Sequence, residues 1–168
     1  ADGGSENPPR RAAEATGRWR KSAAGGSKSQ VIVYLDTSAI LSRFLGQGNA
    51  LPSWGEWIRA FTSVLTEVEY FRTIDRMRLE GQIDDPERVA LHRQFNLLWE
   101  AVHRIPLTPP ILDRAADPFP TVLGTLDALH LASALAIIPS LDEPLVFLTH
   151  DQQLGRGAEA LGLQVEGT

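Results

Sequence analysis

The chain has 168 residues, of which 43% are hydrophobic, enough for one domain with a single sizeable core. It contains no cysteine, which excludes disulfides, thiolate metal sites and cysteine nucleophiles. Of the 16 Lys/Arg and 21 Asp/Glu residues, six and three lie in residues 1–30; residues 31–168 therefore carry ten basic and eighteen acidic side chains, which excludes a broad basic surface that coats nucleic acid.

Residues 1–30 differ in composition from the rest of the chain. They are rich in Gly, Ser, Ala and Arg, with Trp19 as the only large apolar side chain. We expect a disordered or extraneous N-terminal extension, either a basic arm for nucleic acid or a tail without a catalytic part, followed by one domain at residues 31–168. No apolar run approaches the roughly 20 residues that span a bilayer, and no signal-peptide core is present, so we expect a cytoplasmic protein.

From Val31 onward, strand-like and helix-like segments alternate. The predicted strands are short and apolar: Val31–Leu35, Ala60–Val64, Val102–Ile105, Leu145–Leu148 and Leu163–Val165. The predicted helices fill the segments between them: Thr37–Leu45, Thr66–Glu80, Pro86 to about Trp99, Ile111–Ala116, Leu126–Ile138 and Gln152–Leu161. This alternation predicts an α/β fold with a mainly parallel sheet that is covered on both faces.

Acidic residues lie where two of these strands end and where two helices begin. Asp36 follows the strand VIVYL directly, and Asp151 follows the strand in LVFLTHD. Asp127 lies near the start of the helix LDALHLASAL, and Glu67 and Glu69 lie early in the helix that begins LTEVEYFR. Because active sites in open α/β sheets gather beyond the carboxyl ends of the strands, we expect these acids to converge on one pocket.

Converging carboxylates repel one another unless some take up protons or a cation lies among them. Mg²⁺ prefers oxygen ligands, and Mn²⁺ suits the same set of oxygens. Such a cluster predicts metal-assisted attack of water on a phosphodiester.

Each acid also has a simpler structural explanation. Asp36 and Asp151 are both well placed to cap the helix that follows, which is a common use of Asp. Asp127 lies in one of the most apolar stretches of the chain, where a charge needs a partner. Helical spacing does not separate Glu67 from Glu69, because both lie near the edge of the apolar face expected from Leu65, Val68 and Phe71, and either fits a solvated surface position.

Four segments together resemble the PIN-domain ribonucleases, and in particular the VapC-type toxins of prokaryotic toxin–antitoxin pairs: VIVYLDTSAIL, TSVLTEVEYFR, LGTLDALHLASAL and VFLTHDQQLGRGAEALGL. They occur in the family's order and cover nearly everything from Val31 to Val165. The resemblance implies a three-layer α/β/α sandwich around a mainly parallel sheet. It also implies a Mg²⁺-dependent endoribonuclease that forms a homodimer, acts on RNA and is inhibited by a cognate antitoxin protein.

The resemblance also assigns roles to single residues. The family's second segment has the form S-x-L-T-x-x-E-x-x-R, which this chain matches with Glu69 in the acidic position and Glu67 as the fallback. By the same matching, Asp36, Asp127 and Asp151 correspond to the metal-binding acids. The remaining candidates are hydroxyl groups that orient water or a carboxylate, and arginines that contact RNA phosphates or are simply solvated: Ser38, Thr149, Arg43, Arg72 and Arg76.

Two departures from the family pattern stand out. Gly124 occupies a position where the family often has Arg, which bears on the grip on RNA or on the antitoxin. Val31 occupies the position of the family's usual initiator Met, which suggests that Val31 is the true start and residues 1–30 are an upstream extension. His130, three residues after Asp127, fits either a hydrogen-bonded packing role or that of a catalytic base.

Two other functions compete with the toxin interpretation. One is a non-catalytic PIN-like module that binds RNA or protein without cutting. The other is a haloacid-dehalogenase-type phosphatase, which also places an Asp after its first strand. That family expects a second Asp two positions later, where this chain has Ser38.

Overall fold

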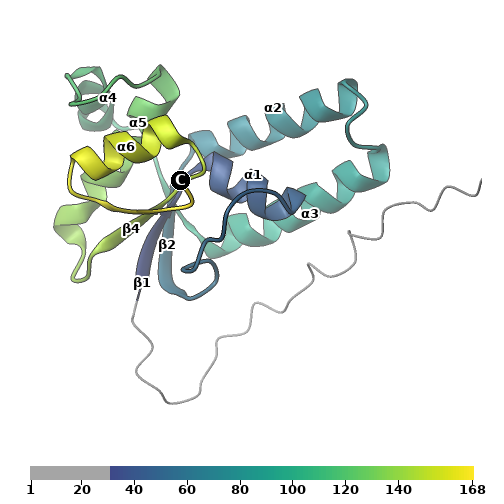
Figure 1. Cartoon of the computed structure of the whole chain (residues 1–168), viewed down its shortest axis with the longest axis horizontal. Helices are drawn as coiled ribbons and strands as arrows, with labels where there is room; N and C mark the ends of the chain where they lie inside the picture. Colours follow the sequence, from purple (N-terminus) through teal and green to yellow (C-terminus); the bar gives the residue numbers. More distant parts are fainter. Residues whose placement is uncertain (1–30) are drawn as a thin grey trace, which may run out of the picture.

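The computed structural model describes residues 31–168, which form a five-stranded, fully parallel sheet flanked by helices (Figure 1). The strands lie in the spatial order β3-β2-β1-β4-β5, with bounds β1 Val31–Leu35, β2 Trp57–Ser63, β3 His103–Ile105, β4 Leu145–Leu148 and β5 Gln164–Glu166. The helices are α1 Thr37–Leu45, α2 Leu65–Leu79, α3 Asp85–Ala101, α4 Pro109–Ala116, α5 Thr125–Ile137 and α6 Gln152–Ala160, with a short 3₁₀ turn, η1, at Ile138–Ser140. The predicted N-terminal extension lies outside the described residues.

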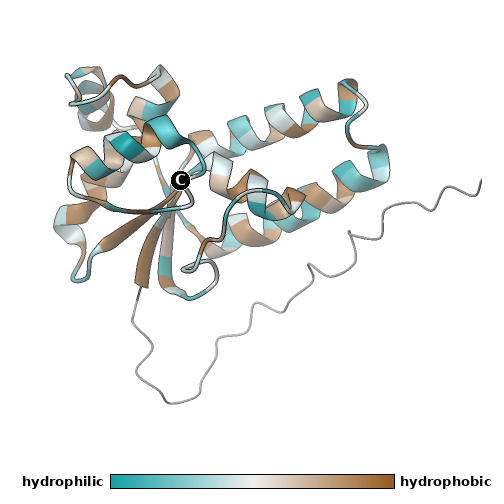
Figure 2. Cartoon of the chain, in the orientation of Figure 1, coloured by the Kyte–Doolittle hydropathy of each residue, from teal (hydrophilic) through white to brown (hydrophobic). Residues whose placement is uncertain are grey.

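The central strand β1 faces both layers of helices. Its side chains alternate, so that Val33 and Leu35 pack into a core with α1, α2 and α3, whereas Ile32 and Tyr34 pack into a second core with α4, α5 and α6. The sheet strands are strongly hydrophobic, whereas the helices carry both hydrophilic and hydrophobic residues (Figure 2). The predicted three-layer α/β/α sandwich is therefore confirmed.

Strand β2 begins three residues earlier than the sequence predicts. Its first residue, Trp57, pairs with Val31 on β1, and the exposed Ile58 and the charged Arg59 continue the strand before Ala60. A strand buried on both faces is marked by a continuous run of buried apolar residues, which the charge of Arg59 and the exposure of Ile58 interrupt. The sequence pattern therefore identified only the buried C-terminal half of β2.

The arrangement of the strands brings the predicted site elements together at one edge of the sheet. Leu35, the last residue of β1, pairs with Leu148, the last residue of β4, and the Asp36 amide donates to the Leu148 carbonyl at 3.0 Å. The chain then enters α1 and α6 from this edge, and α2 follows the end of β2. None of the helices in residues 31–168 is both long and apolar enough to cross a membrane.

Candidate active site

Asp36 is a buried carboxylate between β1 and α1, only 5% exposed. Its Oδ2 atom accepts hydrogen bonds from the Ser38 amide at 3.1 Å, from the Ser38 hydroxyl, and from the Thr149 hydroxyl at 2.9 Å. The capping role is thus real, but it occupies one oxygen only. The other oxygen, Oδ1, lies 3.7 Å from Nε2 of His130.

The two hydroxyl groups predicted to support the site both contact Asp36. Ser38 and Thr149 also approach each other at 3.1 Å between their hydroxyl oxygens. The amides of His150 and Asp151 donate to the Ser38 and Thr149 hydroxyls, at 2.9 and 3.0 Å respectively. These bonds connect the turn after β4 to the Asp36 carboxylate and fix its orientation.

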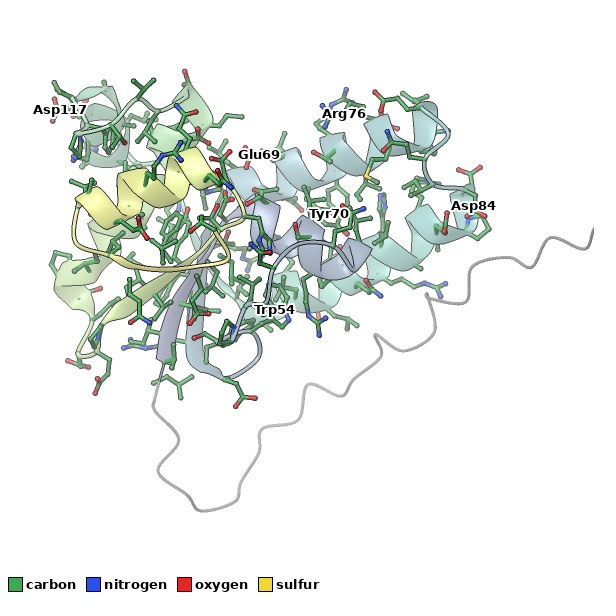
Figure 3. All side chains as sticks on the ribbon, in the orientation of Figure 1. Trp54, Glu69, Tyr70, Arg76, Asp84 and Asp117 are labelled. Carbon is green, nitrogen blue, oxygen red and sulfur yellow. The ribbon has the colours of Figure 1, made fainter. Side chains whose placement is uncertain are left out.

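Glu69 lies on the first turns of α2 and joins the same network (Figure 3). Its Oε2 atom accepts hydrogen bonds from the Thr37 hydroxyl and from His130 Nε2, both at 2.6 Å. Burial alone would raise the pKa of Glu69, but the hydrogen bond and charge of His130, with the Thr37 bond, outweigh it and lower the pKa. Glu69 is therefore held as a carboxylate.

The two glutamates of α2 differ in environment. Glu67 is exposed, whereas the Glu69 side chain is 20% exposed and bonded to Thr37 and His130. The expected apolar face was wrong, because Val68, one of its members, is 59% exposed. The buried residues of α2 are instead Thr66, Tyr70 and Ile74, spaced four apart, and Thr66 is buried because its hydroxyl pairs with that of Thr62 at 2.7 Å.

His130 on α5 is the buried hub of this network, with 1% exposure. Besides its contacts with the two acids, its Nδ1 atom lies 2.9 Å from the Tyr34 hydroxyl. Burial lowers the pKa of His130, but the Glu69 hydrogen bond and the carboxylates of Asp36, Glu69 and Asp127 outweigh it, so the pKa is raised. Burial also raises the pKa of Tyr34, which keeps its phenol protonated.

Asp127 lies in the first turn of α5 and is only partly buried. Its neighbour Leu126 is 48% exposed, so this apolar stretch does not enclose the acid as the sequence suggested. Burial followed by the carboxylates of Asp151 and Asp36 raises the pKa of Asp127, against a 3.2 Å hydrogen bond from the Gly124 amide. Asp127 is thus within electrostatic reach of both other aspartates.

Asp151 is exposed and caps α6, as its simpler explanation predicted. Its Oδ1 atom accepts from the amides of Gln153 and Leu154 at 2.8 and 2.9 Å. Asp151 is linked to the other acids by its charge, which contributes to the raised pKa of Asp127, and by its amide, which donates to the Thr149 hydroxyl.

A common pattern connects the four acids. In each, the hydrogen bonds found among residues 31–168 fall on a single carboxylate oxygen, which holds the group in place and leaves the second oxygen available to a ligand. Carboxylate oxygens are the kind of donor that Mg²⁺ prefers. In the part of the chain that the structure describes, however, no three acidic or histidine side chains are yet arranged to hold a metal ion. The single four-carboxylate hollow therefore stays a prediction.

Sequence reasoning missed two members of the network. Thr37 donates to Glu69 from the residue directly after Asp36, and its position as a polar side chain at the helix start was the only signal. Tyr34 was read simply as part of an apolar strand, although it is the one residue of VIVYL with a polar group. A buried phenol needs a partner, which is the signal that could have identified it.

The charge environment of Asp127 has a consequence for stability. Because burial and two neighbouring carboxylates raise the pKa of Asp127, the folded state holds its proton more tightly than the unfolded state does. The charge therefore costs stability at pH values above that raised pKa. We expect Asp127→Asn to raise the urea midpoint of unfolding in EDTA at neutral pH, with the gain vanishing at acid pH; a lowered midpoint at neutral pH would contradict the repulsion.

Comparison of the sequence with known proteins identifies the family of the chain. The PIN domain pattern matches residues 33–159. Ribonuclease VapC35 of Mycobacterium tuberculosis is 36% identical over 139 residues, covering 80% of this chain and 95% of that protein. Ribonuclease VapC47 of the same organism is 30% identical over 138 residues, covering 78% and 93%, and ribonuclease VapC45 is 29% identical over 138 residues, covering 80% and 94%. The chain therefore belongs to the PIN-domain family, as a VapC-type ribonuclease.

Proposed function

We propose that this protein is the toxin of a type II toxin–antitoxin pair, an endoribonuclease that hydrolyses RNA phosphodiester bonds with Mg²⁺. The observation that carries the proposal is the closeness of the acids: His130 Nε2 lies 3.7 Å from Asp36 and 2.6 Å from Glu69, and the pKa of Asp127 is raised by burial and then by repulsion from the carboxylates of Asp151 and Asp36. In a ribonuclease, a cation bound among these acids would relieve the repulsion between them. Mn²⁺ fits the same oxygen donors.

In this proposal Asp36 and Asp127 hold the cation, and Asp151 and Glu69 bind a second ion or order water molecules. When bound, Mg²⁺ supplies the chemistry by lowering the pKa of an attacking water and by offsetting charge on the phosphate. Ser38 and Thr149 fix Asp36 through their hydrogen bonds, which keeps its Oδ1 atom facing the site. His130 and Thr37 fix Glu69 in the same way.

Arginines on α2 supply positive charge for the RNA backbone. Arg76 lines a hollow of about 540 Å³ between α1 and α2 that reaches Ser38, and Arg72 and Arg76 line the adjoining one. Arg72 is already paired with Asp75 at 3.3 Å, whereas no ion pair of Arg76 is found within residues 31–168. Arg43 lies in the last turn of α1, where it also complements the helix dipole, and lines another hollow. Arg76, which lines the hollow that reaches Ser38, is the arginine that we expect to contact RNA phosphate.

Replacing Arg76 by Gln is expected to weaken RNA binding without abolishing it. One lost phosphate contact should reduce the slope of log affinity against log salt by about 0.7 for single-stranded RNA. Binding is measured by fluorescence anisotropy in EDTA over a series of salt concentrations. Arg88→Gln, at a half-buried position of α3 where the side chain is paired with Asp85, is the control. An unchanged slope in the Arg76 variant would show that Arg76 makes no contact with an RNA phosphate.

The partners follow from the same proposal. The substrate is RNA, the inhibitor is a cognate antitoxin protein, and the protein works as a homodimer in the cytoplasm. The non-catalytic module remains the alternative, and the observation that favours it is that no three acids in residues 31–168 are arranged to hold a metal as they stand.

One assay separates the two functions. The full chain is incubated with single-stranded and structured RNA in Mg²⁺, in EDTA, and in EDTA followed by excess Mg²⁺. The nuclease proposal predicts cutting in Mg²⁺, none in EDTA and recovery after Mg²⁺ is restored. RNA that is bound but left intact with both Mg²⁺ and Mn²⁺ would establish the alternative.

A further inference from the structure

A continuous hydrogen-bonded chain runs from the middle of the sheet to the acids of the site. The Tyr34 hydroxyl lies 2.9 Å from Nδ1 of His130, and Nε2 of the same ring lies 2.6 Å from Oε2 of Glu69. Tyr34 is fully buried and His130 is 1% exposed. Both ring nitrogens therefore have partners: Nδ1 inside the core, and Nε2 at its edge, where Glu69 is 20% exposed.

The chemistry of the partners fixes the direction of the bonds. A carboxylate offers only acceptors, so Nε2 of His130 must carry the hydrogen that it shares with Glu69. The Thr37 hydroxyl donates to the same Oε2 atom at 2.6 Å. With two donors on Oε2, the Oε1 atom is the one left to a cation or a water molecule.

The histidine ring is itself held in one orientation. The Tyr34 hydroxyl meets Nδ1, and the Tyr34 ring is stacked on Phe147 of β4 with 5.0 Å between centroids and 8° between planes. Rotation of the imidazole would break both its hydrogen bonds inside the core, which is costly. The imidazole also stands 3.7 Å from Oδ1 of Asp36, so it sets the spacing between Asp36 and Glu69.

We propose that Tyr34 and His130 are positioning residues for the nuclease: they lock the Glu69 carboxylate with Oε1 toward the site and keep it apart from Asp36. The role rests on the proposed function of Glu69. It differs from that of a general base, because both nitrogens are already committed, and from simple packing, because it depends on a donor at the Nε2 position. Partners that orient metal-binding groups usually change metal affinity by about 10- to 100-fold when they are removed.

Two amide substitutions separate these roles. The side-chain nitrogen of Gln is the same number of bonds from Cα as Nε2 of His, and that of Asn matches Nδ1. His130→Gln thus keeps a donor toward Glu69, whereas His130→Asn keeps only the position that faces Tyr34. Mn²⁺ affinity is measured on the full chain by electron paramagnetic resonance, and cooperative folding of every variant is checked by thermal melting. His103→Gln, at the exposed start of β3, is the control.

The expected order of affinities is wild type, then His130→Gln close to it, then His130→Asn weaker by about 10- to 100-fold. Equal affinities in the Gln and Asn variants overturn the positioning role and leave the nuclease proposal standing. Absence of any Mn²⁺ binding by the wild type overturns the proposed function instead.

A second measurement covers the case in which His130→Asn does not fold. Tyr34→Phe removes one hydroxyl and keeps the stacked ring, so it should fold, weaken Mn²⁺ binding and shift the ¹⁵N resonance of Nδ1 in His130. In metal-free wild type, the same ¹⁵N spectrum should show a protonated Nε2 atom. An unprotonated Nε2, or wild-type Mn²⁺ affinity in Tyr34→Phe, overturns the positioning role.

Discussion

Asp36→Asn is expected to reduce RNA cleavage by at least about 10²- to 10³-fold, the loss typical when one group that stabilises transition-state charge is removed. The substitution removes a negative charge but keeps an oxygen that can accept from the Ser38 amide and the Thr149 hydroxyl. Asn is as good a helix cap as Asp, so α1 should still begin at the same residue. Single-turnover cleavage of labelled RNA in saturating Mg²⁺ measures the loss, and thermal melting measures the fold.

The chain provides a matched control for this change. Asp84 also caps a helix, α3, with its Oδ1 atom 2.7 Å from the Glu87 amide, at the far end of the α2–α3 hairpin from Glu69 (Figure 3). Asp84→Asn repeats the chemistry of the substitution away from the site and should cut RNA at the wild-type rate. Wild-type cleavage by Asp36→Asn would remove Asp36 from the mechanism.

Glu69→Gln is expected to lower cleavage by about 10²-fold or more, whereas Glu67→Gln leaves it unchanged. Glu69 lies among Thr37, His130 and Asp36, and its lowered pKa keeps it charged, while Glu67 points to solvent two residues away. The Gln side chain can still form a hydrogen bond with Thr37 or His130, but it lacks the negative charge that binds a cation.

The assay is the same single-turnover cleavage, run on both variants across a range of Mg²⁺ concentrations. A loss of cation affinity predicts that high Mg²⁺ restores part of the Glu69→Gln activity. Equal activity in the two variants would show that the acid of α2 has no part in the reaction, and a loss confined to Glu67→Gln would move the site to the fallback residue.

The fold was predictable from the sequence because its strands follow a simple rule. Parallel strands covered on both faces read as continuous apolar runs, and VIVYL and LVFL do so, which also located Asp36 and Asp151 at their exits. The first half of β2 was not predicted, because Ile58 is exposed and Arg59 is charged. Family resemblance then supplied the sandwich and its layers.

The details of the site were less accessible, because tertiary contacts overrode local pattern. Apolar periodicity misplaced the buried face of α2: Val68 is exposed, while Thr66 is buried by a hydroxyl pair that no hydropathy scale anticipates. Only the family pattern favoured Glu69 over Glu67. The link between His130 and Tyr34 joins residues 96 positions apart, and nothing in a single sequence indicates such a pairing.

The most direct test of the account is the position of a bound cation. A crystal of the wild-type protein soaked in Mn²⁺ should give an anomalous peak among the carboxylates of Asp36, Asp127, Asp151 and Glu69, with Asp36 Oδ1 as one ligand. The same soak of Asp36→Asn should leave that position empty or weakly occupied. A manganese ion bound elsewhere with these four acids free of it, in crystals of a protein that cuts RNA, would contradict the account.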